Sequence, residues 1–378
     1  MRLVIAGGGT GGHLFPGLAL AEELLARGNE HSVLFMGAQG GMEERVVAHH
    51  GYQIELMPSL KGGMFTFDAP RKFWRFGKGY LQARRALLNF HAQAVVGLGG
   101  YASALPVVAA WGVEVPAMQL EQNVIPGRTT RFLSHFVSEV GMQFSEAAQL
   151  ISNPVKAKHI GNPLRRRVRE VAAKCAERNL NYRPIPEEPH VLVLGGSQGA
   201  RFLNELMVSS WPKLKKAVPG VRVTLVAGKD DGPRAEDAFA AAGMRGTVVG
   251  FTEAMEDLYA NADMVVARAG ATSLAEISAC ALPSVLIPYP HAADDHQSAN
   301  ARVYNGAGAA WLMPQRDLEH ERFAQRVADI LLQPERRKRM AQAAYELARP
   351  SAAAEVIDRL LNLAGQRAAE PMPMPATA

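Results

Sequence analysis

A glycine-rich turn that runs directly into a histidine is the first part of the chain suited to chemistry. The segment GGGTGGHLFPG, residues 7–17, follows the apolar run RLVIA at residues 2–6. Glycines between a strand and a helix let backbone N–H groups approach an anion, although a turn that only packs helix on sheet has the same sequence. His13 begins the predicted helix, where the positive helix end favours a neutral imidazole. A neutral histidine can take a proton from a sugar hydroxyl; its alternative role is a hydrogen bond to the turn backbone.

The same turn matches the spacing G-x-G-x-x-G of a dinucleotide site, at residues 7–12. Such a site needs an acid at the end of the second strand, about 20 residues on, to hold the ribose. That strand ends at Gln39 here, and the nearest acids, Glu43 and Glu44, come later. A second turn, GGSQGAR at residues 195–201, does not fit the pattern, and neither turn is followed by a P-loop lysine. The sequence therefore argues against a dehydrogenase.

A third strand-to-helix turn, ARAGATSLAEI, occupies residues 267–277. Ser273 and Glu276 have capping-box spacing, and helix capping alone would explain both residues. The alternative is a nucleotide site, with the backbone from Ala271 to Ser273 near phosphate and Glu276 accepting hydrogen bonds from ribose hydroxyls. The residues by themselves leave both interpretations open.

The segment HAADDHQSANA, residues 291–301, gathers polar side chains behind a proline-rich strand end. Recognition of sugar hydroxyls by Gln297 and its neighbours fits this loop. Metal binding fits it equally, although the spacing resembles no known ligand set; the candidate ligands are His291, Asp294, Asp295 and His296. The chain lacks a D-x-D motif, so we expect no metal on a bound diphosphate, with helix N-termini and Arg165 stabilising the leaving group instead.

Residues 61–90 interleave aromatic with basic side chains and contain a single acid, Asp68. This composition is typical of contact with an anionic membrane surface, where each basic residue contributes about 1 kcal/mol. RNA binding would use the same residue types. A surface helix whose aromatic side chains face the core is a third interpretation. The candidate membrane-facing residues are Phe73, Trp74, Arg75, Phe76 and Lys78.

The elements that position these residues alternate between apolar runs and helical patterns, and the alternation occurs twice. It begins at residue 2 and restarts at residues 190–196, after a basic, polar bridge at 165–189. Apolar runs linked by helices predict parallel sheets, so we expect the α/β class with two Rossmann-like domains facing a cleft. The predicted boundaries are residues 1–162 with about 346–365 for the first domain, 163–345 for the second, and a disordered tail at 366–378.

Composition supports a globular protein and excludes several classes. The chain has 378 residues, enough for two domains, with 48% hydrophobic and 20% charged residues. Its net charge of +5 suits anionic partners without choosing among them. Two cysteines cannot form a disulfide framework. We expect neither a secretion signal nor a spanning helix, and therefore a cytosolic protein or one attached to a membrane from the cytosolic side.

Seven motifs, in this order, resemble the MurG family of bacterial N-acetylglucosaminyltransferases over about residues 1–363. They are GGTGGHLFPGLALAEEL (8–24), GLGGYAS (97–103), EQNVIPGRT (121–129), GNPLR (161–165), GGSQGAR (195–201), RAGATSLAEI (268–277) and PHAADDHQSANA (290–301). The resemblance implies a GT-B fold and an inverting, metal-independent transfer without cofactor. N-acetylglucosamine would pass from UDP-N-acetylglucosamine to the 4-hydroxyl of lipid I, the undecaprenyl-linked muramoyl pentapeptide, forming lipid II for peptidoglycan.

The resemblance also implies roles for individual residues. His13 would be the base, and Thr10, Gly11 and Gly12 would line the cleft as part of the donor or substrate site. Asn123 and Arg165 would contact the sugar or diphosphate. Donor contacts would come from Ser197 on the diphosphate, Thr252 on the uracil, Ala271, Thr272 and Ser273 on the phosphates, Glu276 on the ribose, and His296 and Gln297 on the sugar. The protein would be peripheral, on the cytoplasmic face of the cell membrane, with other cell-wall enzymes as partners and no nucleic acid.

Three positions depart from the family pattern. Leu120 stands where the family usually has histidine, and Arg128 and Thr130 replace the usual leucine and asparagine. All three bear on the acceptor side and leave the donor motifs intact. Two other functions remain as alternatives: a UDP-sugar epimerase of the same fold, and a peripheral membrane or nucleic-acid-binding protein, which would explain the basic aromatic segment but not two glycine turns.

Overall fold

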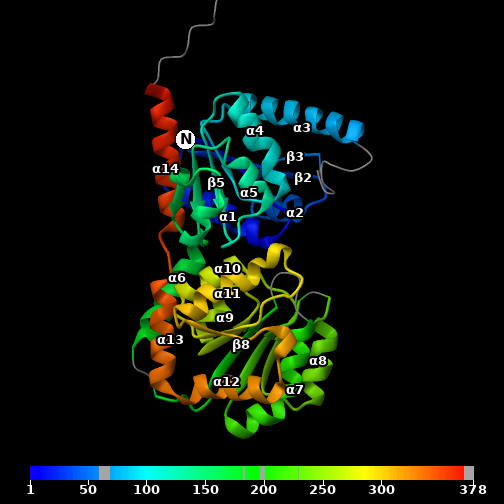
Figure 1. Cartoon of the computed structure of the whole chain (residues 1–378), viewed down its shortest axis with the longest axis vertical. Helices are drawn as coiled ribbons and strands as arrows, with labels where there is room; N and C mark the ends of the chain where they lie inside the picture. The colour runs from blue at the N-terminus through cyan, green and yellow to red at the C-terminus, as the bar shows by residue number, and fades with distance from the viewer. Residues whose placement is uncertain (59–68, 182–183, 196–200, 229, 370–378) are drawn as a thin grey trace, which may run out of the picture. The chain divides into compact units, whose positions relative to one another are not determined.

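The computed structural model describes residues 1–58, 69–181, 184–195, 201–228 and 230–369 (Figure 1). The chain divides into two compact units. The first unit comprises residues 1–122, 126–165 and 351 onwards, and the second comprises residues 123–125 and 166–350. The sequence had placed the boundaries after residue 162 and near residue 346.

The first unit contains a parallel sheet of seven strands in the order β3-β2-β1-β4-β5-β6-β7. The strands are β1 (Arg2–Ala6), β2 (Ser32–Ala38), β3 (Gln53–Met57), β4 (Ala94–Gly97), β5 (Ala117–Glu121), β6 (Glu139–Met142) and β7 (Ala157–His159). Its helices are α1 (Gly11–Leu25), α2 (Met42–His49), α3 (Ala69–Phe90), α4 (Ala104–Gly112), α5 (Arg128–Leu133) and α14 (Ala352–Ala369), with 3-10 turns η1 (Tyr101–Ser103), η2 (Ser145–Leu150) and η3 (Pro154–Lys156).

Alternation along the strands gives this sheet an apolar core on each face. In β1, Leu3 and Ile5 join the core formed with α1 and α14, and Val4 and Ala6 join the core formed with α3 and α4. Successive side chains of a strand point to opposite faces, so a strand buried on both faces is apolar throughout. The C-terminal helix α14, red in Figure 1, thus completes the core of the unit that the N-terminus begins.

The second unit contains a parallel sheet of six strands in the order β10-β9-β8-β11-β12-β13. Its strands are β8 (His190–Leu194), β9 (Arg222–Val226), β10 (Gly246–Val249), β11 (Met264–Ala267), β12 (Ser284–Leu286) and β13 (Ala310–Leu312). Its helices are α6 (Arg166–Leu180), α7 (Arg201–Ala217), α8 (Gly232–Ala241), α9 (Met255–Asn261), α10 (Ala271–Ala279), α11 (His296–Gly306), α12 (His320–Leu332) and α13 (Pro334–Glu346), with 3-10 turns η4 (Ala293–Asp295) and η5 (Gln315–Asp317).

The prediction of two Rossmann-like, parallel-sheet α/β halves is confirmed. The shared cleft expected between them stays a prediction. Helix α14 continues to Ala369, and the rest of the predicted tail, residues 370–378, lies outside the described residues. Within the described part of the chain, no helix combines the length and the apolar character needed to cross a membrane.

Candidate active site

Each sheet has one point where the strand order reverses, and glycine motifs follow the strands on either side of it in the sequence. In the first unit β1 and β4 are neighbours, so the turn after residue 6 and the GLGG turn at residues 97–100 leave the same edge. In the second unit β8 and β11 are neighbours, and the motifs beginning at residues 195 and 268 follow them. Ligands of open α/β sheets bind outside the carboxyl ends of the strands at such a switch point.

The first glycine turn is occupied by a carboxylate of the protein itself. Glu43, in the first turn of α2, is only 1% exposed. Its Oε2 accepts a hydrogen bond from the N–H of Gly9 at 2.8 Å, and its Oε1 accepts one from the N–H of Ala38 at 2.9 Å. The Gly9 N–H, a donor that a dinucleotide site would aim at pyrophosphate, is thus bonded to Glu43. This explains in physical terms why the G-x-G-x-x-G spacing is not a dinucleotide site.

The glycines around Glu43 leave room for its side chain. A Cβ atom at Gly8 would lie 2.3 Å from the Glu43 carboxyl carbon, and one at Gly41 would lie 2.3 Å from Oε2. A Cβ at Gly37 would lie 2.4 Å from the Glu43 Cγ. In the sequence Glu43 appeared only as an acid too distant to bind a ribose. The overlooked signal is that glycines before α1 and around the end of β2 leave space for the side chain of one acid.

His13 is the third residue of α1 and lies against the GLGG turn of β4. Its Nδ1 lies 3.1 Å from the Thr10 hydroxyl. A Cβ at Gly99 would lie 3.1 Å from the His13 Cδ2 and 3.2 Å from its Nε2, and Gly99 has a φ of +95°, which favours glycine. The imidazole therefore packs on backbone that carries no side chain. When Nδ1–H donates to Thr10, Nε2 is the basic nitrogen.

Other predicted substrate-binding residues take defined places in the first unit. Thr10 is the N-cap of α1, and Gly11 and Gly12 are its first two residues. The Arg165 guanidinium lies over the Phe15 ring, 5.0 Å from its centroid.

Leu120, which departs from the family pattern, is buried, as are the two residues after it. Leu120, at the family's histidine position, belongs to the apolar core that includes Met118 and Ile160. Next to it, the Glu121 carboxylate accepts the N–H of Gly127 at 3.0 Å. Gln122 donates to the carbonyl of Leu98 at 2.9 Å, which ties this segment to the GLGG turn. The leucine thus fills the core, and the polar residues after it fix the loop.

In the second unit, the capping-box interpretation of Ser273 and Glu276 is wrong. Helix α10 begins at Ala271, its N-cap is Gly270, and no side chain caps it. Ser273 and Glu276 therefore lie inside the helix, and the nucleotide-site interpretation stays a prediction. Glu276 is buried, and its Oε2 accepts a hydrogen bond from the Tyr259 hydroxyl at 2.9 Å.

Asn300, which the sequence analysis did not single out, joins two of the predicted motifs. It is fully buried in α11. Its amide donates to the Asn123 Oδ1 at 3.0 Å and to the Ala269 carbonyl at 3.1 Å, and its Oδ1 accepts the N–H of Val124 at 2.9 Å. Residues 123–125 consequently belong to the second unit. The signal that could have identified Asn300 is an asparagine at a position of the helix that faces the core, because a buried amide needs hydrogen-bond partners.

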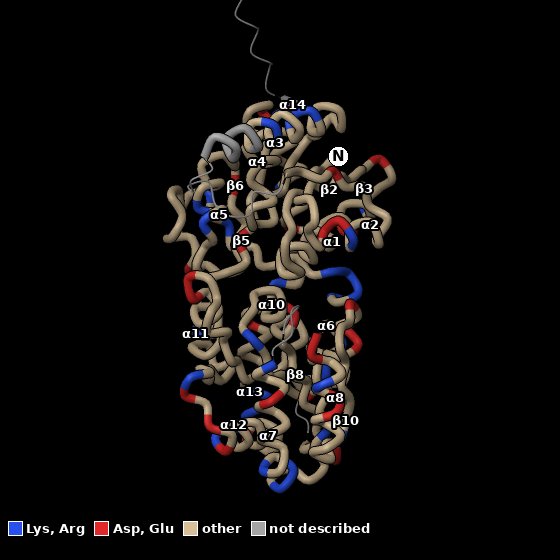
Figure 2. The backbone as a smooth tube through the Cα atoms, turned by 90° about the vertical axis from the view of Figure 1, so that its right-hand side faces the viewer, with Lys and Arg blue, Asp and Glu red and all other residues tan. Residues whose placement is uncertain are grey.

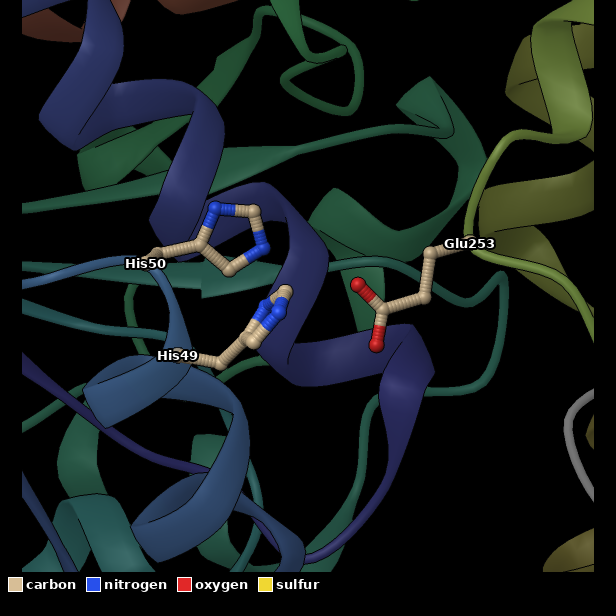
Figure 3. Close-up of side chains that lie close together, drawn as sticks. All are labelled: His49, His50 and Glu253. Carbon is tan, nitrogen blue, oxygen red and sulfur yellow. The ribbon is translucent and has the colours of Figure 1, made fainter.

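The sugar-side candidates begin α11. The Gln297 Oε1 accepts the N–H of Tyr289 at 3.0 Å, and the His296 Nδ1 lies 2.7 Å from the Ala293 carbonyl oxygen. The hypothesis of a metal set in residues 291–296 finds no support: among the described residues, His291, Asp294, Asp295 and His296 do not bring three ligand atoms together. Figure 3 shows His49, the last residue of α2, with His50 after it and Glu253 of the second unit; no site is assigned to them.

Two further features surround the nucleotide motifs. The Thr252 hydroxyl, after β10, accepts the N–H of Ala254 at 3.0 Å. Arg268 is buried between the rings of Phe202 and Tyr289 and donates to the carbonyls of Ile287 and Pro288, both at 3.0 Å. Burial lowers the pKa of Arg268 to about 10, so it stays charged at neutral pH. Ser197 lies outside the described residues.

The membrane candidates lie on α3, which has an apolar and a basic side. Phe76 and Tyr80 pack with Ala83 and Leu87 on the core of the unit, as the core-facing interpretation expects for the aromatic residues. Lys78 is exposed. The side chains of Phe73, Trp74 and Arg75 lie outside the described residues.

Comparison with known proteins gives consistent matches. Residues 3–142 match the family described as "Glycosyltransferase family 28 N-terminal domain", and residues 190–359 match "Glycosyltransferase family 28 C-terminal domain". A Geobacter sulfurreducens protein is 40% identical over 362 residues, covering 96% of this chain and 98% of its own. An Anaeromyxobacter dehalogenans protein is 41% identical over 376 residues, covering 98% and 95%. Both are named UDP-N-acetylglucosamine--N-acetylmuramyl-(pentapeptide) pyrophosphoryl-undecaprenol N-acetylglucosamine transferase.

Solved structures agree on the fold. The crystal structure of Acinetobacter baumannii MurG matches with a TM-score of 0.73 and 26% identity, covering 96% of this chain and 99% of that one. A UDP-GlcNAc 2-epimerase from Neisseria meningitidis, bound to UDP-GlcNAc, matches with a TM-score of 0.67 at 12% identity, covering 96% and 100%. The second likeness extends to the fold alone.

Proposed function

The chain belongs to the MurG family, within glycosyltransferase family 28, and we propose that it makes lipid II from lipid I. It transfers N-acetylglucosamine from UDP-N-acetylglucosamine to the 4-hydroxyl of the undecaprenyl-linked muramoyl pentapeptide. The observation that carries this is 40–41% identity, over 96–98% of the chain, to proteins named for that reaction. The same likeness favours transfer over epimerisation, because the epimerase resemblance is 12% identical and extends to the fold alone.

The reaction is a single displacement at the anomeric carbon of the donor sugar. The His13 Nε2 takes the proton of the acceptor 4-hydroxyl as the oxygen attacks, the bond from the anomeric carbon to the diphosphate oxygen breaks, and UDP leaves with the electron pair. Configuration inverts because the oxygen attacks the face opposite UDP. The Thr10 contact to Nδ1 and the packing on Gly99 support this role, since both hold the ring in one orientation.

On the donor side, the first turn of α10 takes the phosphates, because backbone N–H groups and the helix dipole stabilise negative charge there. Ala271, Thr272 and Ser273 form this turn. Glu276, one turn further along, accepts from the ribose hydroxyls. The remaining donor contacts are Thr252 on the uracil, Ser197 on the diphosphate, and His296 and Gln297 on the sugar.

The other family positions complete the proposed site. Asn123 contacts the sugar or diphosphate. Asn300 donates to its side-chain Oδ1 and accepts the backbone N–H of the next residue, Val124. Arg165 supplies positive charge, and Thr10, Gly11 and Gly12 face the acceptor. Partnership with other cell-wall enzymes stays a prediction.

The experiment that tests the function mixes the purified protein with labelled UDP-N-acetylglucosamine and lipid I. We expect label to move into a lipid product that runs as lipid II. Conversion of UDP-N-acetylglucosamine to another UDP-sugar without lipid I would instead establish the epimerase alternative. Absence of both reactions in a protein that binds UDP would contradict the proposal.

We predict that transfer proceeds without a divalent metal. The diphosphate charge is met by the first turn of α10 and by arginine, so no ion is needed to stabilise the leaving group. Excess EDTA is expected to leave the initial rate within about twofold of the untreated rate. A loss of activity that added Mg²⁺ restores would contradict this. A fixed ionic strength in all samples is the control.

The membrane attachment that we propose uses the basic side of α3. Lys78, Arg84 and Arg85 are exposed there (Lys and Arg are blue in Figure 2). Leu81 and Leu88 lie among them with 53% and 46% of their surfaces exposed. Exposed leucines between basic residues suit the interface of an anionic bilayer, where charge draws the helix in and apolar side chains insert. The protein would be peripheral, on the cytoplasmic face where its acceptor is made.

Charge removal on α3 is expected to weaken membrane binding. The double variant Arg84→Gln, Arg85→Gln loses about 1 kcal/mol per residue, so its vesicle affinity should fall by about 30-fold. The measurement is co-sedimentation with phosphatidylglycerol vesicles at low salt. Lys215→Gln with Lys216→Gln, two exposed residues of α7, removes the same charge from the second unit as a control. Equal losses in both double variants would contradict a role specific to α3.

A further inference from the structure

We propose that Tyr259 is a positioning residue that holds the carboxylate of Glu276 for the ribose of the uridine nucleotide. The inference rests on the proposed function, in which Glu276 accepts hydrogen bonds from the ribose. Tyr259 has no exposed surface, and its hydroxyl donates to the Glu276 Oε2 at 2.9 Å. Neither the family motifs nor the sequence analysis pointed to this tyrosine.

The chemistry of the pair explains why a ribose acid needs a buried donor. A glutamate has three side-chain torsions, and fixing them in one conformation costs conformational entropy. Without a fixed partner, this cost would reduce the affinity for the ribose. A hydrogen bond from a fixed hydroxyl selects the arrangement in advance. A carboxylate has about four lone-pair directions, so one bond from tyrosine leaves acceptor capacity for two ribose hydroxyls. Hydrogen bonds to an ionised carboxylate are also stronger than those between neutral groups.

The helix that carries Tyr259 is itself held in place. Arg178 of α6 donates to the carbonyls of Ala260 and Ala262, at the C-terminal end of α9. The Cys175 thiol, also of α6, lies 3.7 Å from the Tyr259 carbonyl oxygen. With its backbone bonded and its ring buried, Tyr259 presents its hydroxyl to the Glu276 carboxylate from a fixed position.

A second tyrosine of the same unit provides a matched control. Tyr304 of α11 is also buried, and its hydroxyl also bonds to α10, donating to the Leu274 carbonyl at 2.9 Å and lying 2.5 Å from the Ser278 hydroxyl. Tyr259→Phe and Tyr304→Phe each remove one buried hydroxyl that contacts the same helix. They differ in which group of that helix loses its partner: the Glu276 carboxylate, or a backbone carbonyl and a serine.

The test compares binding of UDP and 2′-deoxy-UDP by calorimetry in the full-length protein and both variants. The natural protein is expected to prefer UDP by about tenfold, because the deoxy compound lacks one hydroxyl for Glu276. Tyr259→Phe should weaken UDP binding by about five- to twentyfold and 2′-deoxy-UDP binding by less than about threefold. The ratio of the two dissociation constants should therefore fall towards one. Tyr304→Phe should keep the preference. The ratio is taken within one sample, so it does not depend on the fraction of protein folded.

Kinetics and a double-mutant cycle separate positioning from a general structural effect. In Tyr259→Phe the KM for UDP-N-acetylglucosamine should rise while kcat stays within about threefold. In a Glu276→Ala background, adding Tyr259→Phe should change UDP affinity by less than about twofold, because the acceptor of the tyrosine hydroxyl is already absent.

Two results would overturn the inference in distinguishable ways. If the natural protein prefers UDP and Tyr259→Phe keeps that preference, Tyr259 does not act through Glu276, and the proposed function stands. If the natural protein binds both nucleotides equally, the ribose role of Glu276 fails and the inference fails with it. The transfer assay with lipid I decides the overall reaction independently of either result.

Discussion

Replacing His13 with alanine is expected to lower kcat by about a hundred- to ten-thousandfold, which is the contribution typical of a positioned general base. The loss arises because the acceptor 4-hydroxyl then has no group to take its proton as the new bond forms. The affinity for UDP should stay within about twofold, since the proposed nucleotide contacts belong to other motifs in the second unit. The measurements are steady-state transfer to lipid I and calorimetric titration with UDP.

The matched control is His135→Ala, which removes an exposed histidine of the same unit that is bonded to the Phe132 carbonyl. It should keep the natural rate. A His13→Ala variant that turns over at a comparable rate would remove His13 from the base role. A variant that loses rate only because UDP no longer binds would assign His13 to donor binding instead.

Replacing Glu43 with alanine is expected to have the largest effect on stability. The change leaves the N–H groups of Gly9 and Ala38 without their acceptor and opens a cavity in the glycine turn. Hydrogen bonds to a charged group are worth about 1.5–3 kcal/mol each, so we expect the free energy of unfolding to fall by about 3–5 kcal/mol. Urea denaturation followed by circular dichroism measures it. Activity should fall as well, because the displaced turn carries Thr10 and His13.

Two further variants, Glu43→Gln and Glu44→Ala, serve as controls for the Glu43→Ala result. The glutamine oxygen can accept only one of the two N–H groups, so its loss should be about half that of alanine. Glu44 is the exposed neighbour, and its Oε2 lies 3.3 Å from the Gly40 nitrogen. Its replacement should cost less than about 1 kcal/mol. Equal stability of the Glu43 and Glu44 alanine variants would show that the carboxylate does not hold the turn.

Much of the fold followed from short-range patterns. Burial on both faces of a parallel strand requires an apolar run such as residues 2–6, and the repeated alternation of such runs with amphipathic helices predicted two Rossmann-like halves. Glycine turns are also local signals, because close approach and positive φ demand glycine whatever the rest of the chain does. The ordered motifs therefore identified the family correctly from residues that lie close together in the sequence.

The ends of helices and the hydrogen-bond partners of buried side chains were harder to predict from the sequence. Helix α10 begins at Ala271 rather than being capped by Ser273, because Gly270 has the extended backbone that an N-cap requires. Two predicted contacts fall outside what the structure describes: that of Ser197, and the membrane contact of residues 73–75.

The sequence by itself determined the two parallel sheets, the glycine turns and the ordered family motifs, since these depend on periodicity and backbone geometry. Only the tertiary structure decided which side chains pack into those turns and which groups hydrogen-bond to them. Glu43 lies 34 residues from Gly9, Tyr259 lies 17 residues from Glu276, and Asn300 lies 177 residues from Asn123. No local pattern links such pairs, because the order of strands in a sheet decides which loops meet at its edge. Once they meet, each buried polar group must find a partner there.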